Sequence, residues 1–320
     1  MDMQVLELIA RTIGFITIFK ALIAVCRWVW VTFLRPSKNL KEYGSWALVT
    51  GSTDGIGKAL VFELASKGLH LILVGRNPAK LKATSTEIQE RYGSEVKVRS
   101  VVIDFSSDSI EVIGKRIEEG IEGLDLGILI NNVGMCNRWP RFFHEAESVD
   151  DIIKVNVEGM LRVTRAVLPA MLKKRKGAIV NIGSGSADIL PSFPLYSVYA
   201  ATKAYIHYFS RSLYVEYKHH GIDVQCQIPL FVATKILPMS LSSFLAPTPE
   251  EYSKACLRWI GYEPLCMPYW RHSLQGTLAQ AIPAGFTDWV ALKCFLRLRK
   301  IRKSKAMRDV MKRNSKIQNA

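Results

Sequence analysis

The sequence predicts an α/β protein built on a doubly wound parallel sheet, with an apolar helix before the sheet and a basic tail after it. Short apolar runs alternate with segments of helical periodicity from residue 46 onward, as in parallel sheets whose two faces are covered by helices. The first apolar run is followed by a glycine-rich segment, Thr50-Gly51-Ser52-Thr53-Asp54-Gly55-Ile56-Gly57. Farther along, Tyr199 and Lys203 stand four residues apart, on one face of an expected helix.

The expected elements follow one another in strand–helix order. Strands are expected at residues 46–50, 69–75, 96–104, 126–131, 178–183 and 222–228, with a shorter one near 265–270. Helices are expected at residues 55–67, 78–92, 109–122, 148–172 and 197–219. We expect three parts along the chain: an anchor with its linker (1–40), the sheet domain (41–270, with a lid at about 235–264), and an amphipathic segment with a basic tail (271–320).

The apolar segment at residues 8–34 predicts a membrane anchor. It is longer than the roughly 20 residues that a helix needs to cross a bilayer. Its cations Arg11, Lys20 and Arg27 argue against a removable signal peptide, but long cationic side chains near the ends can reach the membrane surface. A soluble amphipathic helix is the alternative. If the segment spans a membrane, the cations around residues 27–41 place the sheet domain on the cytosolic side.

The charge of the chain is concentrated at its C-terminal end. Of the net charge of +15, residues 293–320 contribute 11 Lys or Arg against one acid, Asp309. A basic tail in a chain with an apolar anchor indicates contact with anionic membrane rather than with nucleic acid, and a solvated tail is the alternative. The six cysteines have no metal-ligand or disulfide spacing, so no metal is expected.

The glycine turn predicts a dinucleotide site. Because it joins a strand to a helix, its residues from Gly51 to Gly57 are expected to bring backbone N–H groups to a pyrophosphate at the helix N-terminus. Arg76 follows the second strand, where an acid would bind the ribose of NAD; an arginine suits the 2′-phosphate and predicts NADPH. Asp104, after the third strand, is a candidate for the adenine amino group or a plain turn residue. Asn131 and Gly134 are expected to bring backbone close to the cofactor, and Asn131 is also expected to tether neighbouring strands.

The Tyr199–Lys203 pair predicts acid–base chemistry. Carbonyl reduction leaves an alkoxide that needs a proton, and a free phenol with a pKa of about 10 is a poor acid–base group near neutrality. A lysine ammonium one helical turn away favours the phenolate and is expected to lower the pKa of Tyr199. The same spacing recurs at Tyr214 and Lys218, which we take as coincidence.

Over residues 45–270 the sequence resembles the short-chain dehydrogenase/reductase family, by the glycine turn, Asn131-Asn132-Val133-Gly134, Asn156 and the Tyr199–Lys203 pair. The resemblance implies a Rossmann fold and joint action of Asn156, a serine, Tyr199 and Lys203, with Asn156 holding a water that links Lys203 to solvent. The segment Pro229-Leu230-Phe231-Val232-Ala233-Thr234 resembles the family's segment over the nicotinamide, which implies cofactor contacts for Val232 and Thr234. Leu230 stands where the family often has glycine.

The serine has two candidates. Ser184 closes the strand-end pattern Asn181-Ile182-Gly183-Ser184, whereas the family's usual interval before the tyrosine selects Ser186. We favour Ser184, because the strand determines its position and the proline-containing loop after it can absorb two extra residues. A serine hydroxyl there can donate a hydrogen bond to the substrate carbonyl.

A closer resemblance is to the membrane-bound very-long-chain 3-oxoacyl-CoA reductases of fatty acid elongation, particularly those of plants. It is carried by segments such as Phe33-Leu34-Arg35-Pro36-Ser37-Lys38-Asn39-Leu40, Tyr43-Gly44-Ser45-Trp46 and Ile222-Asp223-Val224-Gln225-Cys226-Gln227. It implies reduction of long-chain 3-oxoacyl-CoA with NADPH, elongase subunits as partners, a homodimer as one assembly, and an endoplasmic reticulum location with a cytosolic active site. A hydroxysteroid dehydrogenase and a catalytically weak elongase scaffold are the alternatives.

Overall fold

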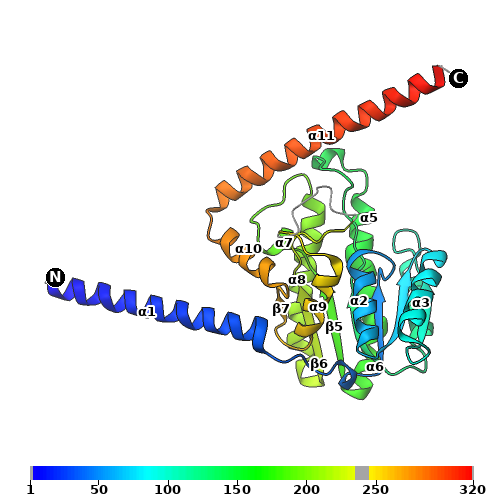
Figure 1. Ribbon diagram of the computed structural model, residues 1–320, viewed down its shortest axis with the longest axis horizontal. Coiled ribbons are helices and arrows are strands. Elements are labelled where there is room, and N and C mark those ends of the chain that lie inside the picture. Colours follow the sequence, from blue (N-terminus) through cyan, green and yellow to red (C-terminus); the bar gives the residue numbers. More distant parts are fainter. Residues whose placement is uncertain (1–2, 235–244, 319–320) are drawn as a thin grey trace. The chain divides into compact units, whose positions relative to one another are not determined.

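The computed structural model describes residues 3–234 and 245–318, and the chain divides into two compact units, Met1–Ser37 and Lys38–Ala320 (Figure 1). The first unit is the apolar segment. The second contains the whole sheet and the helices that cover it. Residues 235–244, which form the first part of the expected lid, lie outside the described residues.

The first unit is a single helical span. It consists of α1 (Met3–Val29) and a π-helical turn, Trp30–Leu34. An 18-residue stretch within these 32 residues has a mean hydropathy of 2.0, and α1 has no buried residue. The apolar side chains of α1 are not gathered on one face, unlike those of an amphipathic surface helix. The helix is therefore long and apolar enough to cross a membrane.

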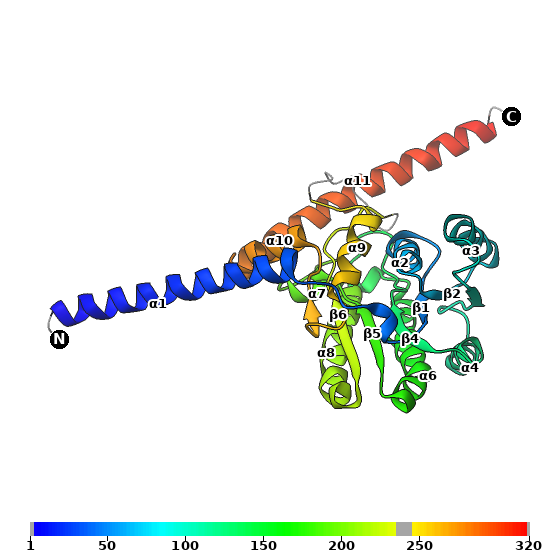
Figure 2. The same ribbon diagram turned by 60° about the horizontal axis from the view of Figure 1, so that its bottom comes forward.

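Seven parallel strands form one sheet in the order β3-β2-β1-β4-β5-β6-β7 (Figure 2). The strands are β1 (Trp46–Thr50), β2 (His70–Gly75), β3 (Val98–Val102), β4 (Leu126–Asn131), β5 (Gly177–Ile182), β6 (Ile222–Gln227) and β7 (Leu265–Cys266). The order reverses between β1 and β4, which is the switch point where doubly wound sheets bind ligands. The predicted sheet is confirmed, including the short seventh strand.

Helices cover both faces of the sheet. Alternate residues of β1 show the two layers, because Ala47 and Val49 face one apolar core and Leu48 faces the other. The first core also contains side chains of α2 (Gly55–Ser66), α3 (Pro78–Tyr92) and α9 (Pro249–Trp259). The second contains side chains of α4 (Ile110–Ile121), α6 (Gly159–Lys174) and α8 (Ser197–Tyr217).

Local signals determine where several helices begin. The side chain of Asn77 accepts a hydrogen bond from the Lys80 N–H at 3.0 Å, and Pro78 opens α3. The Thr248 hydroxyl accepts one from the Glu251 N–H at 3.2 Å and forms a capping box at the start of α9. Such caps satisfy amide groups that the first helical turn leaves without partners.

Four helices were not expected from the sequence: α7 (Gly185–Asp188), α9, α10 (Trp270–Gln280) and α11 (Ala284–Gln318). The expected helix at 148–172 is divided into α5 (Val149–Ile153), a π-helical turn (Lys154–Glu158) and α6. Tyr252 and Cys256 of α9 are fully buried against the sheet. The expected lid at about 235–264 remains a prediction.

Candidate active site

The glycine turn places three glycines where a side chain would not fit or would be strained. Gly51 and Gly55 have φ values of +68° and +51°, in the left-handed region that favours glycine. A Cβ atom on Gly57 would lie 2.1 Å from the Gly51 carbonyl oxygen. The first turn of α2 thus packs directly against the loop, and its N-terminal N–H groups lie at the carboxyl edge of the sheet, a favourable place for an anion.

Asn132 at the end of β4 holds this turn, a contact that the sequence analysis missed. Its Nδ2 donates to the carbonyl oxygens of Thr50 at 3.0 Å and Gly51 at 3.3 Å. The backbone N–H groups of Asn132 and Val133 donate to Thr50 Oγ1. The Asn131-Asn132 pair in the sequence was a signal, but only the register of β1 and β4 shows which asparagine reaches the turn.

Asn131 is buried and points to the other side of β4. Its Nδ2 donates to Asn181 Oδ1 of β5 at 2.8 Å and to Thr164 Oγ1 of α6 at 2.9 Å. It therefore ties β4 to its neighbouring strand, as expected of a tether. A cofactor contact by Asn131 remains a prediction.

The remaining residues of the turn have distinct positions. Thr53 packs at the end of β2, since a Cβ on Gly75 would lie 3.4 Å from Thr53 Cγ2. Asp54 caps α2 by accepting a hydrogen bond from the Gly55 N–H at 2.9 Å. The half-buried Ile56 packs against the first core. Thr234, in the segment after β6, contacts the turn, because a Cβ on Gly55 would lie 3.2 Å from Thr234 Cγ2.

Arg76 and Asp104 lie together at the ends of neighbouring strands. Arg76 is exposed directly after β2. A hydrogen bond from Ser106 lowers the pKa of Asp104, and the charges of Arg76 and Lys154 lower it further. Asp104 Oδ1 accepts hydrogen bonds from the N–H and the hydroxyl of Ser106, which is the geometry of a turn aspartate. Arg76 thus stands where the sequence analysis expects a 2′-phosphate.

Lys203 and Tyr199 are neighbours on α8, where Lys203 is buried and Tyr199 is half-buried. Lys203 Nζ donates to the Ile182 carbonyl oxygen at 2.8 Å and lies 5.8 Å from the centroid of the Tyr199 ring. Burial lowers the pKa of Lys203 to about 8. In the repeated motif, Lys218 Nζ lies 5.4 Å from the centroid of the Tyr214 ring. Unlike Lys203, however, Lys218 is exposed.

The expected lowering of the Tyr199 pKa is wrong for this structure. Burial raises the pKa of Tyr199 to about 12, and a hydrogen bond with Ser184 opposes part of that rise. Tyr199 is therefore protonated at neutral pH, which is the state that a proton donor needs.

The two serines have different surroundings. Ser184 is half-buried at the N-terminal end of α7 and is hydrogen-bonded to Tyr199. Ser186 is 7% exposed, and both its hydroxyl and its N–H donate to Ser184 Oγ, at 2.9 and 3.2 Å. Ser186 is more deeply buried than Ser184 and donates its hydrogen bonds to it. The geometry therefore favours Ser184 as the serine that contacts a substrate.

Asn156 lies on the π-helical turn and is 1% exposed. Its Oδ1 accepts from the Met135 N–H at 2.7 Å, and its Nδ2 donates to the Met135 carbonyl at 2.8 Å and to Thr202 Oγ1 at 3.0 Å. The amide thereby holds the segment after β4 against α8. A Cβ on Gly134 in that segment would lie 3.6 Å from Lys203 Nζ. The expected water at Asn156 remains a prediction.

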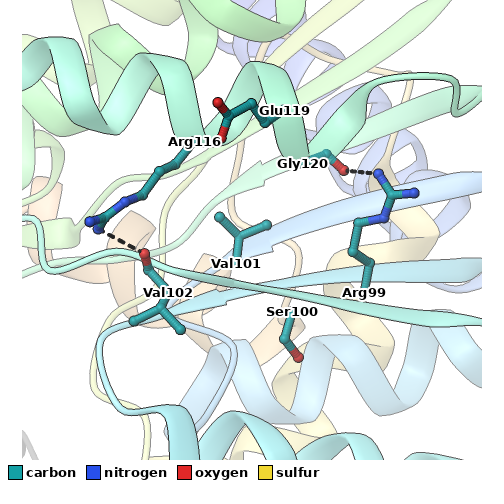
Figure 3. A pocket seen from close by; sticks show the side chains of 7 residues that line it. All are labelled: Arg99, Ser100, Val101, Val102, Arg116, Glu119 and Gly120. Atoms are coloured by element: carbon teal, nitrogen blue, oxygen red, sulfur yellow. Dashed lines mark hydrogen bonds between the residues drawn. The ribbon is translucent and has the colours of Figure 1, made fainter.

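A surface hollow between β3 and α4 is separate from this site (Figure 3). Arg116 donates to the Val102 carbonyl and Arg99 to the Gly120 carbonyl, each at 3.0 Å, and these bonds tie the outermost strand to its helix. The hollow contains none of the expected site residues. Among the described residues, no group of three or more His, Cys, Asp or Glu side chains is arranged to hold a metal ion.

Comparison with known proteins agrees with this geometry. A family profile described as short chain dehydrogenase matches residues 45–242. The chain belongs to the short-chain dehydrogenase family. A very-long-chain 3-oxoacyl-CoA reductase-like protein of Arabidopsis thaliana is 46% identical to this short-chain dehydrogenase over 90% of this chain and 94% of its own. The very-long-chain 3-oxoacyl-CoA reductase of Homo sapiens is 38% identical over 80% of each chain.

Solved structures of other short-chain dehydrogenases share the fold. A 7β-hydroxysteroid dehydrogenase superposes with a TM-score of 0.71 at 26% identity, over 79% of this chain and 99% of that one. A short-chain dehydrogenase from Sphingobium yanoikuyae in complex with NADPH gives a TM-score of 0.60 at 28% identity, over 74% of this chain and 94% of that one. The sheet and site of this short-chain dehydrogenase are thus those of an oxidoreductase.

Proposed function

We propose that this short-chain dehydrogenase reduces the 3-oxo group of very-long-chain 3-oxoacyl-CoA to a 3-hydroxyl group with NADPH, as a step of fatty acid elongation. The observation that carries the proposal is the similarity to reductases of that name, 46% and 38% identical over 90% and 80% of the chain. The meeting of Ser184, Tyr199 and Lys203 supports a reductase rather than a scaffold.

The residues around the glycine turn fit NADPH. Gly51, Gly55 and Gly57 leave a cradle that a Cβ would fill, at the N-terminus of α2, which suits a pyrophosphate. Arg76, near Asp104, is suited to the 2′-phosphate. Thr53, Asp54, Ile56, Asn131, Val232 and Thr234 complete the proposed binding residues. When bound, NADPH supplies the hydride.

The proton comes from the protein. Ser184 and Tyr199 donate hydrogen bonds to the substrate carbonyl oxygen and polarise the C=O bond. After reduction at the carbonyl carbon, the C–O electron pair resides on oxygen as an alkoxide, which takes the proton of the Tyr199 hydroxyl. The positive charge of Lys203 then stabilises the phenolate that remains. Asn156 positions the segment beside Lys203.

The membrane is proposed as part of the working environment. We place α1 in the membrane of the endoplasmic reticulum, with the sheet domain on the cytosolic side, because Arg27 lies near the C-terminal end of the apolar span and Arg35, Lys38 and Lys41 follow it. The basic residues at 293–320 are suited to anionic lipid headgroups. Other elongase subunits and a second copy of the chain are proposed partners.

A hydroxysteroid dehydrogenase is the second candidate. The 7β-hydroxysteroid dehydrogenase fold covers 79% of this chain, and a hydroxysteroid dehydrogenase-like protein of Gallus gallus is 40% identical over 79% of it. Both substrate classes carry a ketone next to a large apolar group, so the shared site does not separate them by itself.

Turnover by full-length protein in microsomes tests the choice. NADPH oxidation is measured with a long-chain 3-oxoacyl-CoA and, separately, with estrone. We expect turnover of the acyl-CoA and little of the steroid. The reverse preference would favour the second candidate, and no turnover of either substrate with a folded, NADPH-binding protein would favour a scaffold.

A further inference from the structure

A buried histidine outside the expected site holds the backbone that follows β6. His272 on α10 has no exposed surface, and the ring centroids of Tyr269 and Tyr252 lie 5.1 and 6.0 Å from that of its imidazole. The Leu230 N–H donates to its Nδ1 at 3.3 Å, and its Nε2 lies 3.1 Å from the Phe231 carbonyl oxygen. Since an amide N–H only donates and a carbonyl only accepts, a neutral ring with its proton on Nε2 satisfies both contacts.

The held segment touches both halves of the site. Leu230 packs on the residue after Ser184, because a Cβ on Gly185 would lie 2.1 Å from Leu230 Cδ2. Four residues after Leu230, Thr234 packs on Gly55 of the glycine turn. Leu230 is also the position at which the sequence departs from the family's glycine. In this chain, the contacts of the imidazole with Leu230 and Phe231 hold the backbone at the position where the family often has glycine.

We propose that His272 is a positioning residue for the cofactor site, holding residues 230–234 against Ser184 and the glycine turn. Burial lowers the pKa of His272 to about 4, so the neutral ring that makes both contacts is the form present at neutral pH. His272 does not touch the reacting groups in this arrangement; it acts through the backbone of Leu230 and Phe231.

The test uses full-length protein in detergent with His272→Ala and His272→Gln. The Kd for NADPH is measured by fluorescence, and amide hydrogen exchange is followed in peptides covering residues 228–234. For His272→Ala we expect the Kd to rise about tenfold, equivalent to ~1.4 kcal/mol, with faster exchange in this segment. His272→Gln keeps one side-chain hydrogen bond and should lie between the variant and the wild type. Neither readout depends on the acyl substrate, so the result stands apart from the proposed function.

Tyr252→Phe is the matched control, because its hydroxyl is buried, packs near His272 and has no hydrogen-bond partner among the described residues. It should leave both readouts unchanged. A folded His272→Ala protein with wild-type Kd and exchange would overturn the proposal. So would a loss of binding that merely follows the unfolded fraction, without faster exchange at 228–234 in the folded protein.

The outer side of α10 has a second feature, which is independent of His272. Large apolar side chains are exposed along α10 and the start of α11, which we call the α10–α11 apolar surface: Leu274 46%, Leu278 61%, Ile282 42%, Phe286 56% and Trp289 56%. Figure 1 shows α10 at the opposite side of the domain from α3. The opposite face of α11 packs on the domain, with the Phe295 ring 4.8 Å from Phe193 and 5.4 Å from Tyr196.

Charge indicates what covers this surface. Trp289 is followed on the same face of α11 by the exposed cations Lys293, Arg297 and Lys300, at intervals of three or four residues. Aromatic and apolar side chains next to a cationic stripe are typical of helices that lie at the surface of an anionic bilayer. We infer that the α10–α11 apolar surface docks on anionic lipid, independently of α1 and of the residues beyond 302.

Full-length protein reconstituted in vesicles tests this docking. A polarity-sensitive fluorophore is placed through Leu278→Cys or, as an exposed control on α8, Tyr208→Cys, with Cys26 and Cys294 replaced by serine. In vesicles of phosphatidylcholine with phosphatidylserine, we expect nitroxide-labelled lipids to quench position 278 and not position 208. Quenching should weaken in phosphatidylcholine alone. A probe at 278 that lipid nitroxides do not quench would overturn the inference, and a blue shift without quenching would assign the surface to a protein partner.

Discussion

Ser186 donates hydrogen bonds to Ser184 Oγ from both its hydroxyl and its backbone N–H, and Ser184 is in turn hydrogen-bonded to Tyr199. This order predicts unequal effects of removing the two hydroxyls. Ser184→Ala should lower kcat on the order of 10²-fold, because it removes a donor to the developing alkoxide. Ser186→Ala should lower kcat by less than tenfold, since it only loosens the orientation of Ser184. Steady-state kinetics of both variants decide this, and a larger loss for Ser186→Ala would exchange their roles.

Tyr199→Phe removes the proposed proton donor and little volume. NADPH binding should survive, while reduction falls about 10²–10⁴-fold. Tyr214→Phe on the same helix is the control and should leave the rate unchanged, because its motif ends in an exposed lysine. NADPH binding by fluorescence and single-turnover reduction measure the two properties separately. Inactivation by Tyr214→Phe, with an active Tyr199→Phe, would mean that the acid is misassigned.

Arg76 should determine the choice of cofactor. In the wild type, kcat/KM for NADPH is expected to exceed that for NADH at least about tenfold, or ~1.4 kcal/mol. Arg76→Asp removes the cation beside Asp104 and places an acid where it repels a 2′-phosphate, so the preference should vanish or invert. Equal kcat/KM values for the two cofactors in the wild type would contradict the assignment.

The pH dependence of reduction should reflect Lys203. Burial lowers its pKa to about 8, so the ammonium loses its charge, and its stabilisation of the Tyr199 phenolate, as the pH rises through that value. The pKa of Tyr199 is about 12, so the proton donor remains protonated over the same range. We therefore expect kcat to fall above about pH 8. In Lys203→Arg, any remaining activity should lack this decline, and a wild-type kcat that stays constant to pH 10 would exclude the explanation.

The two ends of the chain should bind membranes in different ways. Full-length protein should resist extraction by alkali or high salt and dissolve in detergent, because α1 is long and apolar enough to span. A protein lacking the residues before Arg35 should still bind anionic vesicles, since each of the 11 cations at 293–320 can contribute up to about 1 kcal/mol near the surface. Vesicle sedimentation should show this residual binding weakening with salt. A truncated protein that stays unbound at low salt would remove the tail from the membrane interaction.

The proposed orientation of the chain in the membrane leads to a further prediction. Protease added to sealed microsomes should remove the C-terminal tail, because the cations around residues 27–41 orient that side of the span toward the cytosol. Immunoblotting for the C-terminus before and after detergent measures this. A tail protected until detergent is added would reverse the proposed orientation.

The sequence by itself determined the sheet, the glycine turn and the Tyr199–Lys203 pair. These features are local: apolar runs mark strands covered on both faces, and a spacing of four residues places two side chains on one helical face. The positions of Gly51, Gly55 and Gly57 between a strand and a helix likewise follow from residues that are neighbours in the chain.

Only the tertiary structure decided which groups meet across the site. Asn132 rather than Asn131 holds the glycine turn because the register of β4 against β1 turns one amide toward it. His272 reaches Leu230 from α10, a helix that the sequence analysis did not expect. The pKa of Tyr199 rises because burial outweighs the hydrogen bond with Ser184. Each outcome depends on how distant segments pack and how much water they exclude, which no local pattern of residues specifies.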